Sequence, residues 1–196
     1  MPTFARFVLK VTGPEATYSC KYGQLCVGLK AVIDGAVHGV QSILYSNSSE
    51  ENWGFLLVNA KNSFNKINQI GMLWTIYHLC PFGDSFVCNC YRHHSSVVLI
   101  NGDGAENSLH SWEGVMQGDS LDMVACGIEV LPLIERLKLT YPDVTHPKYA
   151  DNSRALHTFN NYERYFNSLK RHGLDRGYYP DPTKSILIVH QNNIKA

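Results

Sequence analysis

The sequence lacks several features that would place it in a special class of protein. No apolar run approaches the roughly 18 to 20 residues that cross a bilayer, and residues 1–16 lack the apolar segment and cleavage site of a secretory signal. The six cysteines are too sparse for a small disulfide scaffold, which favours free thiols. These absences predict an intracellular protein of the nucleus or cytoplasm, with no membrane partner.

An excess of either charge is also absent. Lys plus Arg and Asp plus Glu both number 17, so the protein has no overall basic field of the kind that drives strong binding to phosphates. A nucleic-acid partner would have to be held by a local patch. The 196 residues, 44% of them hydrophobic, are enough for one main globular domain.

The apolar pattern predicts a mixture of helices and short strands. The polar segment 46–52 is the best candidate boundary between an N-terminal region, residues 1–52, and the main domain, residues 53–196. The predicted elements are a helix over 25–44, a strand over 55–58, a helix over 64–77, a hairpin of strands 85–100 and 106–112 around a turn at 101–104, a helix from Asp119 or Ser120 to Lys138 kinked at Pro132, two short strands flanking 149–152, a helix over 162–171 ended by Gly173, and a strand over 185–189.

Four short segments follow one another in a recognisable order. They are LVNAKNSFN at 57–65, GVMQGDSL at 114–121, YADN at 149–152, and PTKS at 182–185 after Gly173. Together they resemble the palm motifs of reverse transcriptases, the RNA-directed DNA polymerases, of the non-LTR retrotransposon type. Ser120 stands where the family has proline, and Asn59 and Asn152 stand where it has aspartates.

The resemblance implies a fold and a reaction. The fold would be α+β, a polymerase palm with an antiparallel sheet packed on helices, with residues 1–52 as a finger-like or pre-motif region, partial fingers and no thumb. The reaction would be two-metal nucleotidyl transfer with Mg²⁺, acting on an RNA or DNA template-primer and a deoxynucleoside triphosphate. The oligomeric state stays open.

The resemblance also assigns roles to residues. Asn59, Asp151 and Asn152 occupy the three acidic catalytic positions, and Asn59 and Asp151 are the expected metal ligands. Lys184 corresponds to a catalytic cation near the triphosphate. The expected nucleotide-binding residues are Phe64, Gln117 and Gly118.

The asparagines change the expected chemistry. Mg²⁺ is usually anchored by carboxylates, and two unit charges about 4 Å apart interact by about 4 kcal/mol at an effective dielectric constant of about 20. One carboxylate, Asp151, remains of the three, so we expect weak Mg²⁺ binding and impaired catalysis. The alternative is a non-enzymatic nucleic-acid-binding or interaction module built on the same palm.

Plainer interpretations compete at several positions. Phe64 on an apolar helix face is equally expected in the core, Lys184 at a solvated strand end, and Asp119 as a helix cap. A zinc site is a further alternative, although its spacing is not that of a known finger and Cys88 and Cys90 fit one face of a predicted strand as buried thiols. The candidate zinc ligands are His78, Cys80, Cys88, Cys90, His93 and His94.

Overall fold

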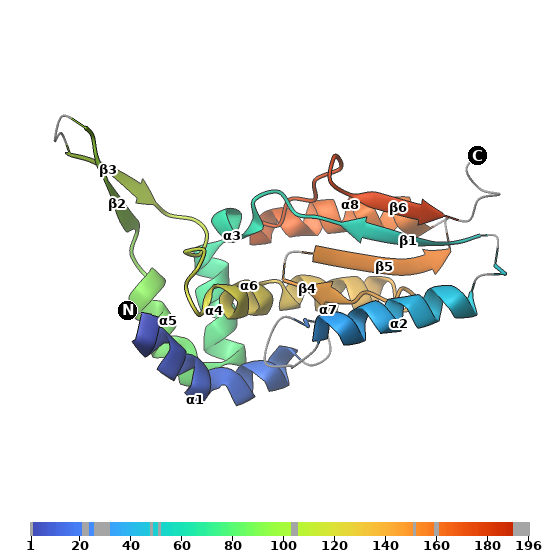
Figure 1. Ribbon diagram of the computed structural model, residues 1–196, viewed down its shortest axis with the longest axis horizontal. Helices are drawn as coiled ribbons and strands as arrows, with labels where there is room; N and C mark the ends of the chain where they lie inside the picture. The colour runs from blue at the N-terminus through green and yellow to red at the C-terminus, as the bar shows by residue number, and fades with distance from the viewer. Residues whose placement is uncertain are drawn as a thin grey trace.

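The protein has an α+β fold in which an antiparallel sheet packs on helices (Figure 1), which confirms the predicted fold class. The computed structural model describes residues 2–20, 24–25, 32–47, 49–50, 52–102, 106–150, 152–158 and 161–189. The helices are α1 (Pro2–Cys20), α2 (Val32–Ser46), α3 (Ser63–Lys66), α4 (Gln69–Leu79), α5 (Pro81–Tyr91), α6 (Asp122–Glu129), α7 (Leu131–Thr140), α8 (Tyr162–Gly173) and the 3-10 helix η2 (Leu174–Arg176). The strands are β1 (Trp53–Val58), β2 (Ser95–Ile100), β3 (Glu106–Ser111), β4 (Lys148–Tyr149), β5 (Asn152–Thr158) and β6 (Ile186–Val189). None of the described helices is long and apolar enough to cross a membrane.

The main sheet has the strand order β4-β5-β1-β6, and each neighbouring pair is antiparallel. Successive side chains of a strand point to opposite faces of the sheet. In β1, Leu56 and Val58 join the core beneath the helices. Phe55 points to the opposite face, is also buried, and lies opposite Leu156 of β5 and Ile188 of β6. Burial on both faces explains why the strand reads as a continuous apolar run.

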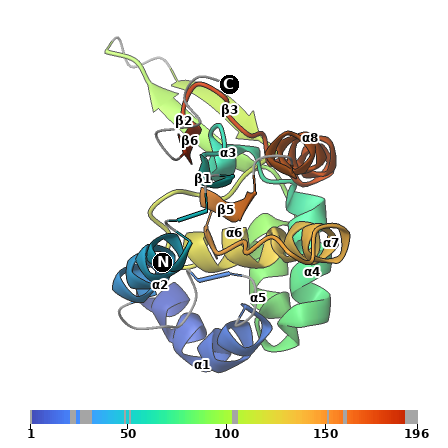
Figure 2. The same cartoon turned by 90° about the vertical axis from the view of Figure 1, so that its right-hand side faces the viewer.

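Helices lie to both sides of the central strands of this sheet. In Figure 2, α7 and α8 lie to one side of β1 and β5, and α2 lies to the other. The amphipathic α8 buries Tyr162, Tyr165 and Leu169 at helical spacing and exposes charged side chains. The core continues through α6 and α4 to α5 and α1, which pack on one another.

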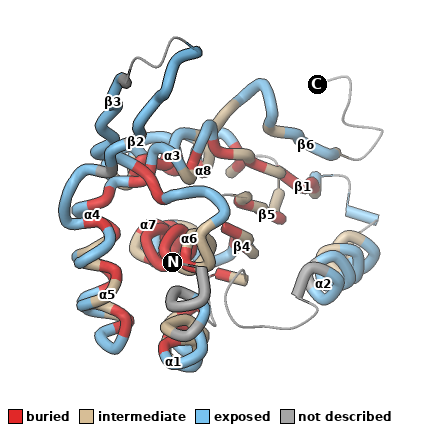
Figure 3. The backbone as a smooth tube through the Cα atoms, turned by 60° about the vertical axis from the view of Figure 1, so that its left-hand side comes forward, coloured by how far each residue is buried: buried red, intermediate tan, exposed pale blue. Residues whose placement is uncertain are grey.

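The strands β2 and β3 form a separate two-stranded ribbon that projects from the body (Figure 1). Their pairing runs from Ser95 opposite Ser111 to Ile100 opposite Glu106. Figure 3 shows the described part of the ribbon as exposed, in contrast to the buried positions of β1, β5 and the central helices. The predicted hairpin is therefore present, although residues 103–105 of its turn lie outside the described residues.

One predicted strand is wrong in its first half, because residues 85–91 belong to helix α5. Pro81 stands in the first turn of this helix, where proline is well tolerated. Gly83, Val87 and Tyr91 are buried at intervals of four residues, so one face of the helix enters the core. Packing against α1 and α4 therefore outweighs the strand propensity of the aromatic and β-branched residues.

Two predicted helices have different boundaries in the structure. The helix predicted over 25–44 corresponds to α2, which begins at Val32. Leu25 instead donates from its N to Lys148 O of β4, and residues 26–31 lie outside the described residues. The helix predicted over 64–77 is divided into α3 and α4, and Asn68 between them accepts a hydrogen bond from Gly71 N at 3.0 Å. An asparagine cap of this kind begins a new helix.

The helix predicted from Asp119 or Ser120 starts later, at Asp122, and is interrupted at Val130. Its N-cap is Leu121 without a side-chain cap, so the predicted capping residues are wrong. The break before Pro132 agrees with the predicted kink. The strands at 55–58, beside 149–152 and at 185–189, and the helix ending at Gly173, are confirmed. The domain boundary at residue 52 stays a prediction.

Candidate functional site

The ends of two central strands bring the first and third motifs together. Val58 of β1 pairs with Ser153 of β5, so the end of β1 and the start of β5 meet at the same edge of the sheet. Asn59 follows β1 and donates a hydrogen bond from Nδ2 to Oδ1 of Asn152 at 3.3 Å. We call Asn59, Asn152 and the turn that precedes Asn152 the strand-end site.

The turn of the strand-end site connects β4 to β5 and is tight. Tyr149 and Asn152 are paired across it, and Ala150 adopts a left-handed backbone conformation with φ of 50°. That conformation costs a non-glycine residue about 1 to 2 kcal/mol, so surrounding contacts must hold it. Asp151, the retained carboxylate of the motif, lies outside the described residues.

The fourth motif lies beside the end of β1. Asp181 N donates to Asn59 O at 2.8 Å, and Lys61 N donates to Tyr179 O at 2.7 Å. Lys184 is exposed and its backbone N donates to Asp181 O at 3.2 Å. The structure therefore brings the backbone of the lysine-bearing segment to the strand-end site.

Asp181 is a carboxylate near the site that the sequence motifs did not single out. Its side chain accepts hydrogen bonds from the hydroxyl of Thr183 at 2.6 Å and from Thr183 N at 3.0 Å. These bonds, with smaller contributions from Lys184 and Lys61, lower the pKa of Asp181. The carboxylate of Asp181 therefore stabilises the turn from Asp181 to Thr183.

The second motif packs against the helix that carries Phe64. Val115 N donates to Phe64 O at 2.6 Å, and Gly114 N donates to Ile67 O at 2.8 Å. Gly114 has φ of 79°, and a Cβ there would lie 2.6 Å from the backbone of Asn65, so glycine is required. The ring of Phe64 packs partly against the core, as the plainer interpretation expected.

The expected nucleotide-binding turn is exposed at both Gln117 and Gly118. Gly118 has φ of 88°, and its N–H donates to Oδ2 of Asp122 at 2.8 Å. The carboxylate of Asp122 in the first turn of α6 therefore holds this turn, whereas Asp119 and Ser120, the predicted helix caps, precede the N-cap Leu121. The roles of Gln117 and Gly118 toward a nucleotide stay predictions.

Strand β4 itself contains a buried lysine, Lys148, that the sequence motifs did not single out. Lys148 is 1% exposed, its Nζ has no hydrogen-bond partner among the described residues, and it lies 5.1 Å from the centre of the Tyr178 ring. Burial lowers the pKa of Lys148 to about 7. His146 has its pKa lowered to about 4, first by burial and then by Lys148.

A second buried charge lies among the helices. Glu129 of α6 is 0% exposed and its Oε1 lies 3.3 Å from Nη1 of Arg176. Its Oε2 accepts a hydrogen bond from the hydroxyl of Thr75 at 3.2 Å. Burial raises the pKa of Glu129 to about 7 even though Arg176 lowers it. We call Glu129, Thr75 and Arg176 the helix-side charge cluster.

The zinc alternative finds no support among the described residues, which contain no group of three or more His, Cys, Asp or Glu side chains placed to hold a metal ion. Cys88 and Cys90 lie on helix α5 instead of on a strand. His94 stacks with His110 and Trp112, with ring centres 4.5 and 4.6 Å apart.

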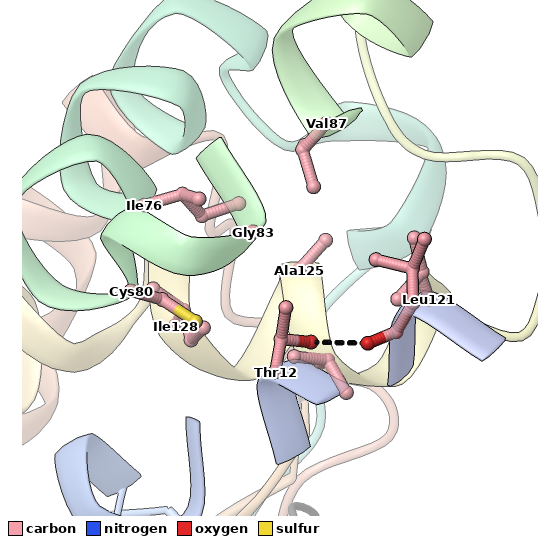
Figure 4. Close-up of a pocket in the computed structure, with 10 residues that line it drawn as sticks. Thr12, Ile76, Cys80, Gly83, Val87, Leu121, Ala125 and Ile128 are labelled. Carbon is pink, nitrogen blue, oxygen red and sulfur yellow. Dashed lines mark hydrogen bonds between the residues drawn. The ribbon is translucent and has the colours of Figure 1, made fainter. Parts of the chain in front are cut away.

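The structure also contains a small cavity of about 20 Å³ between α1, α4, α5 and α6 (Figure 4). Its lining is largely apolar, and the hydroxyl of Thr12 donates a hydrogen bond to Val8 O at 3.0 Å. Burial first, and then the nearby Glu15, raises the pKa of the Cys80 thiol to about 12, which makes it unreactive. The space is a packing defect of about the size of one water and offers no catalytic chemistry.

The fold just described is similar to that of part of solved telomerases. The chain is similar to the telomerase of Candida albicans in complex with a fragment of telomeric RNA, with a TM-score of 0.72 and 12% sequence identity over 97% of this chain. It is also similar to the apo telomerase of Candida tropicalis, with a TM-score of 0.70 and 11% identity over 98% of this chain.

The similarity is confined to part of these neighbours. The chain spans 35% and 37% of the length of the two telomerase chains. No protein-family model matches the sequence, and no curated protein matches it. The comparisons therefore establish a reverse-transcriptase-related fold.

Proposed function

We propose that this chain is the palm of a reverse transcriptase of non-LTR retroelement origin whose strand-end site has lost efficient nucleotide addition. The observation that carries the proposal is the hydrogen bond between Asn59 and Asn152 at 3.3 Å. It supports the proposal because it joins two of the three positions at which the motif resemblance expects catalytic carboxylates. The amides at both positions are neutral and hydrogen-bond to one another, so they carry no charge to attract a cation.

The described donors do not fit a pair of Mg²⁺ ions. An asparagine offers one neutral carbonyl oxygen, whereas Mg²⁺ in proteins is anchored by carboxylates. In the strand-end site the Asn152 carbonyl oxygen already accepts from Asn59. Asp151 would be the one carboxylate left among the three motif positions, and a single carboxylate supplies too little charge to hold two divalent ions close together.

The role that remains is contact with nucleic acid. The related telomerases of Candida albicans and Candida tropicalis were solved with a fragment of telomeric RNA, which supports a nucleic-acid partner. Lys61 and Lys184 are exposed near the strand-end site and would approach a phosphate backbone. The net charge is zero, so binding should be weak.

Primer extension tests the catalytic part of the proposal. The palm is grafted into an intact relative that supplies its own fingers and thumb, and four grafts are compared: native, Asn59→Asp, Asn152→Asp and the double variant. We expect background extension from the native graft. The first aspartate should restore more activity than the second, because it occupies the position expected to contact both ions.

A control graft carrying Asp151→Ala defines the background. If the native graft extends a primer in Mg²⁺ clearly above this control, the site works without the two charges and the proposal is wrong. Metal binding gives a second readout on the isolated chain. Mn²⁺ should raise the melting temperature of the double variant and leave that of the native chain unchanged.

Nucleic-acid binding separates the impaired polymerase from a specialised binding module. A filter-binding titration with a primer-template duplex should give a Kd in the micromolar range or weaker, and binding should be lost by about 0.5 M salt. Nanomolar affinity that persists at that salt concentration would favour the non-enzymatic binding module, because it would require a dedicated nucleic-acid surface.

A further inference from the structure

The side chain of Gln24 is buried against the turn of the strand-end site, 126 positions away in the sequence. Its Oε1 accepts a hydrogen bond from Ala150 N at 2.8 Å, and its Nε2 donates to Ala150 O at 3.1 Å. Gln24 is 0% exposed and Ala150 is 3% exposed. One carboxamide therefore satisfies both polar backbone groups of the left-handed residue.

The backbone of Gln24 aligns this side chain with the sheet. Gln24 forms a parallel bridge with Lys148, and Leu25 N donates to Lys148 O at 2.8 Å. Because β4 ends at Tyr149, the carboxamide extends the pairing to Ala150, one residue past the strand. A primary amide presents a donor and an acceptor side by side, as a neighbouring strand would.

We propose that Gln24 is a positioning residue of the strand-end site, a role that rests on the proposed function: by holding Ala150 it fixes the β4–β5 turn so that Asn152 meets Asn59. The two residues that follow Ala150 in the chain are the second half of the YADN motif. A non-glycine residue keeps a left-handed conformation only where its surroundings hold it. Gln24 supplies two hydrogen bonds to that residue.

The length and chemistry of glutamine are both needed. Asparagine is shorter by one methylene and would not reach both groups of Ala150 from the same backbone position. An ionised glutamate accepts from Ala150 N but cannot donate to Ala150 O, whereas a protonated glutamic acid does both. Burial raises the pKa of a carboxyl group, so the protonated form is accessible at mildly acidic pH.

The first test uses the native full chain and needs no substitution. A scalar coupling across the hydrogen bond between Ala150 ¹⁵N and Gln24 ¹³Cδ should be observed by NMR, along with similar couplings between β1 and β5. If the couplings of the β1–β5 ladder are seen and this one is absent, Gln24 does not hold Ala150 and the inference is overturned.

The second test compares hydrogen exchange in Gln24→Ala and Gln24→Glu. In Gln24→Ala the protection of the Ala150 amide should fall about tenfold at every pH, while amides of the β1–β6 ladder keep their protection. In Gln24→Glu the protection should be low at pH 8 and return near pH 5. A protection in Gln24→Ala equal to that of the native chain, or no recovery of Gln24→Glu in acid, would contradict the proposed role.

The third test links Gln24 to the site itself. In the Asn59→Asp and Asn152→Asp double variant, adding Gln24→Ala should weaken Mn²⁺ binding about tenfold, because the loosened turn no longer holds residue 152 in place. Equal Mn²⁺ affinity with and without Gln24→Ala would refute positioning. If the double variant alone binds no Mn²⁺, the proposed function fails, and the coupling and exchange measurements still decide the role of Gln24.

Discussion

The polar groups of the strand-end site and of the helix-side charge cluster differ in charge and in depth of burial. At the strand ends, Asn59 and Asn152 are neutral and pair with each other. Among the helices, Glu129 is fully buried and is compensated by Arg176 and Thr75. The fold therefore accommodates a buried carboxylate where a cation and a hydroxyl compensate it. Burial alone does not explain why amides replace carboxylates at Asn59 and Asn152.

The two regions should also differ in what they contribute to stability. A buried ion pair is strongly destabilised when one partner is removed, because the other charge is left without compensation. A half-buried amide pair exchanges its hydrogen bond for one with water. The helix-side charge cluster should therefore matter for folding, and the strand-end site mainly for function.

The largest effect is expected at Arg176. Arg176→Met should lower the free energy of unfolding by about 3 kcal/mol at pH 8, because Glu129 is left buried without its cation. Urea unfolding of the native chain and of Arg176→Met measures this difference in the free energy of unfolding. Glu113→Gln is the control, since the Lys66–Glu113 pair has side chains 51% and 58% exposed and should contribute less than about 1 kcal/mol. Equal costs for the two variants would remove the contrast between buried and exposed pairs.

The pH dependence of the same pair follows from its pKa. Glu129 has a pKa of about 7 when folded against an ordinary value of 4.5, so between these values the folded state holds the proton more tightly. The contribution of Glu129 to stability is therefore greatest below pH 4.5 and falls as the pH rises to 7. The cost of Arg176→Met should accordingly be smaller at pH 5.5 than at pH 8.

A smaller effect, of opposite sign, is expected at Lys148. Lys148→Met should raise the free energy of unfolding by about 2 kcal/mol at pH 7, because the native chain must bury an amine that water would otherwise keep charged. The folded pKa of about 7 lies below the ordinary 10.5, so native stability rises with pH across this range and the advantage should vanish near pH 10.5.

Urea unfolding at pH 7, 8.5 and 10 measures this trend at pH values where His146 stays neutral. The exposed Lys170→Met is the matched control and should show no such gain. A Lys148 variant that is less stable than the native chain at pH 7 would mean that the contact with the Tyr178 ring outweighs the cost of burial.

A third comparison uses two helical glycines. A Cβ at Gly71 would lie 2.9 Å from Oε1 of Glu129, so Gly71→Ala should cost about 1 kcal/mol by displacing the buried carboxylate. A Cβ at Gly39 of α2 would have no atom within 4 Å, so Gly39→Ala should gain about 0.5 to 1 kcal/mol from helix propensity. Thermal unfolding of both variants tests this. Stabilisation by both would show that the Glu129 side chain moves aside at little cost, and destabilisation by both would show that helix propensity does not decide the effect at Gly39.

The smallest effect is expected at the strand ends. Asn59→Ala should change the free energy of unfolding by less than about 1 kcal/mol, because the amide pair is half-buried and its partner can bond to water. Chemical denaturation beside Arg176→Met gives the comparison directly. A loss near 3 kcal/mol would show that the amide pair is a structural element of the same rank as the ion pair.

The sequence predicted the elements whose signals are local. The apolar run 55–58, the hairpin turn after Ile100 and the amphipathic pattern of α8 each contain enough information to define the element. The convergence of Asn59 and Asn152 was expected from the motif resemblance alone, since no local pattern connects residues 93 positions apart. In α5 the buried Gly83, Val87 and Tyr91 show helical spacing, but the strand-prone composition concealed it.

The residues that sequence reasoning missed act over long distances. Gln24 resembles any polar residue until its carboxamide is seen against Ala150. Glu129 is the last residue of the largely buried helix α6, and its burial is compensated by Arg176 of η2, 47 positions later in the sequence. Lys148 lies at the start of β4 beside the YADN motif, yet nothing local in the sequence places its Nζ over the ring of Tyr178. Such partners are chosen by the tertiary fold, which local periodicity cannot specify.

The open side of β6 has a consequence for handling the protein in solution. β6 pairs with β1 on one side, no described strand pairs with its other side, and Ile186, Leu187 and Ile188 are each about half exposed. An apolar strand with unpaired backbone groups is a template onto which another chain can add. Concentrated samples should therefore self-associate along this strand, and a lysine in place of Leu187 is the simplest way to keep the chains apart.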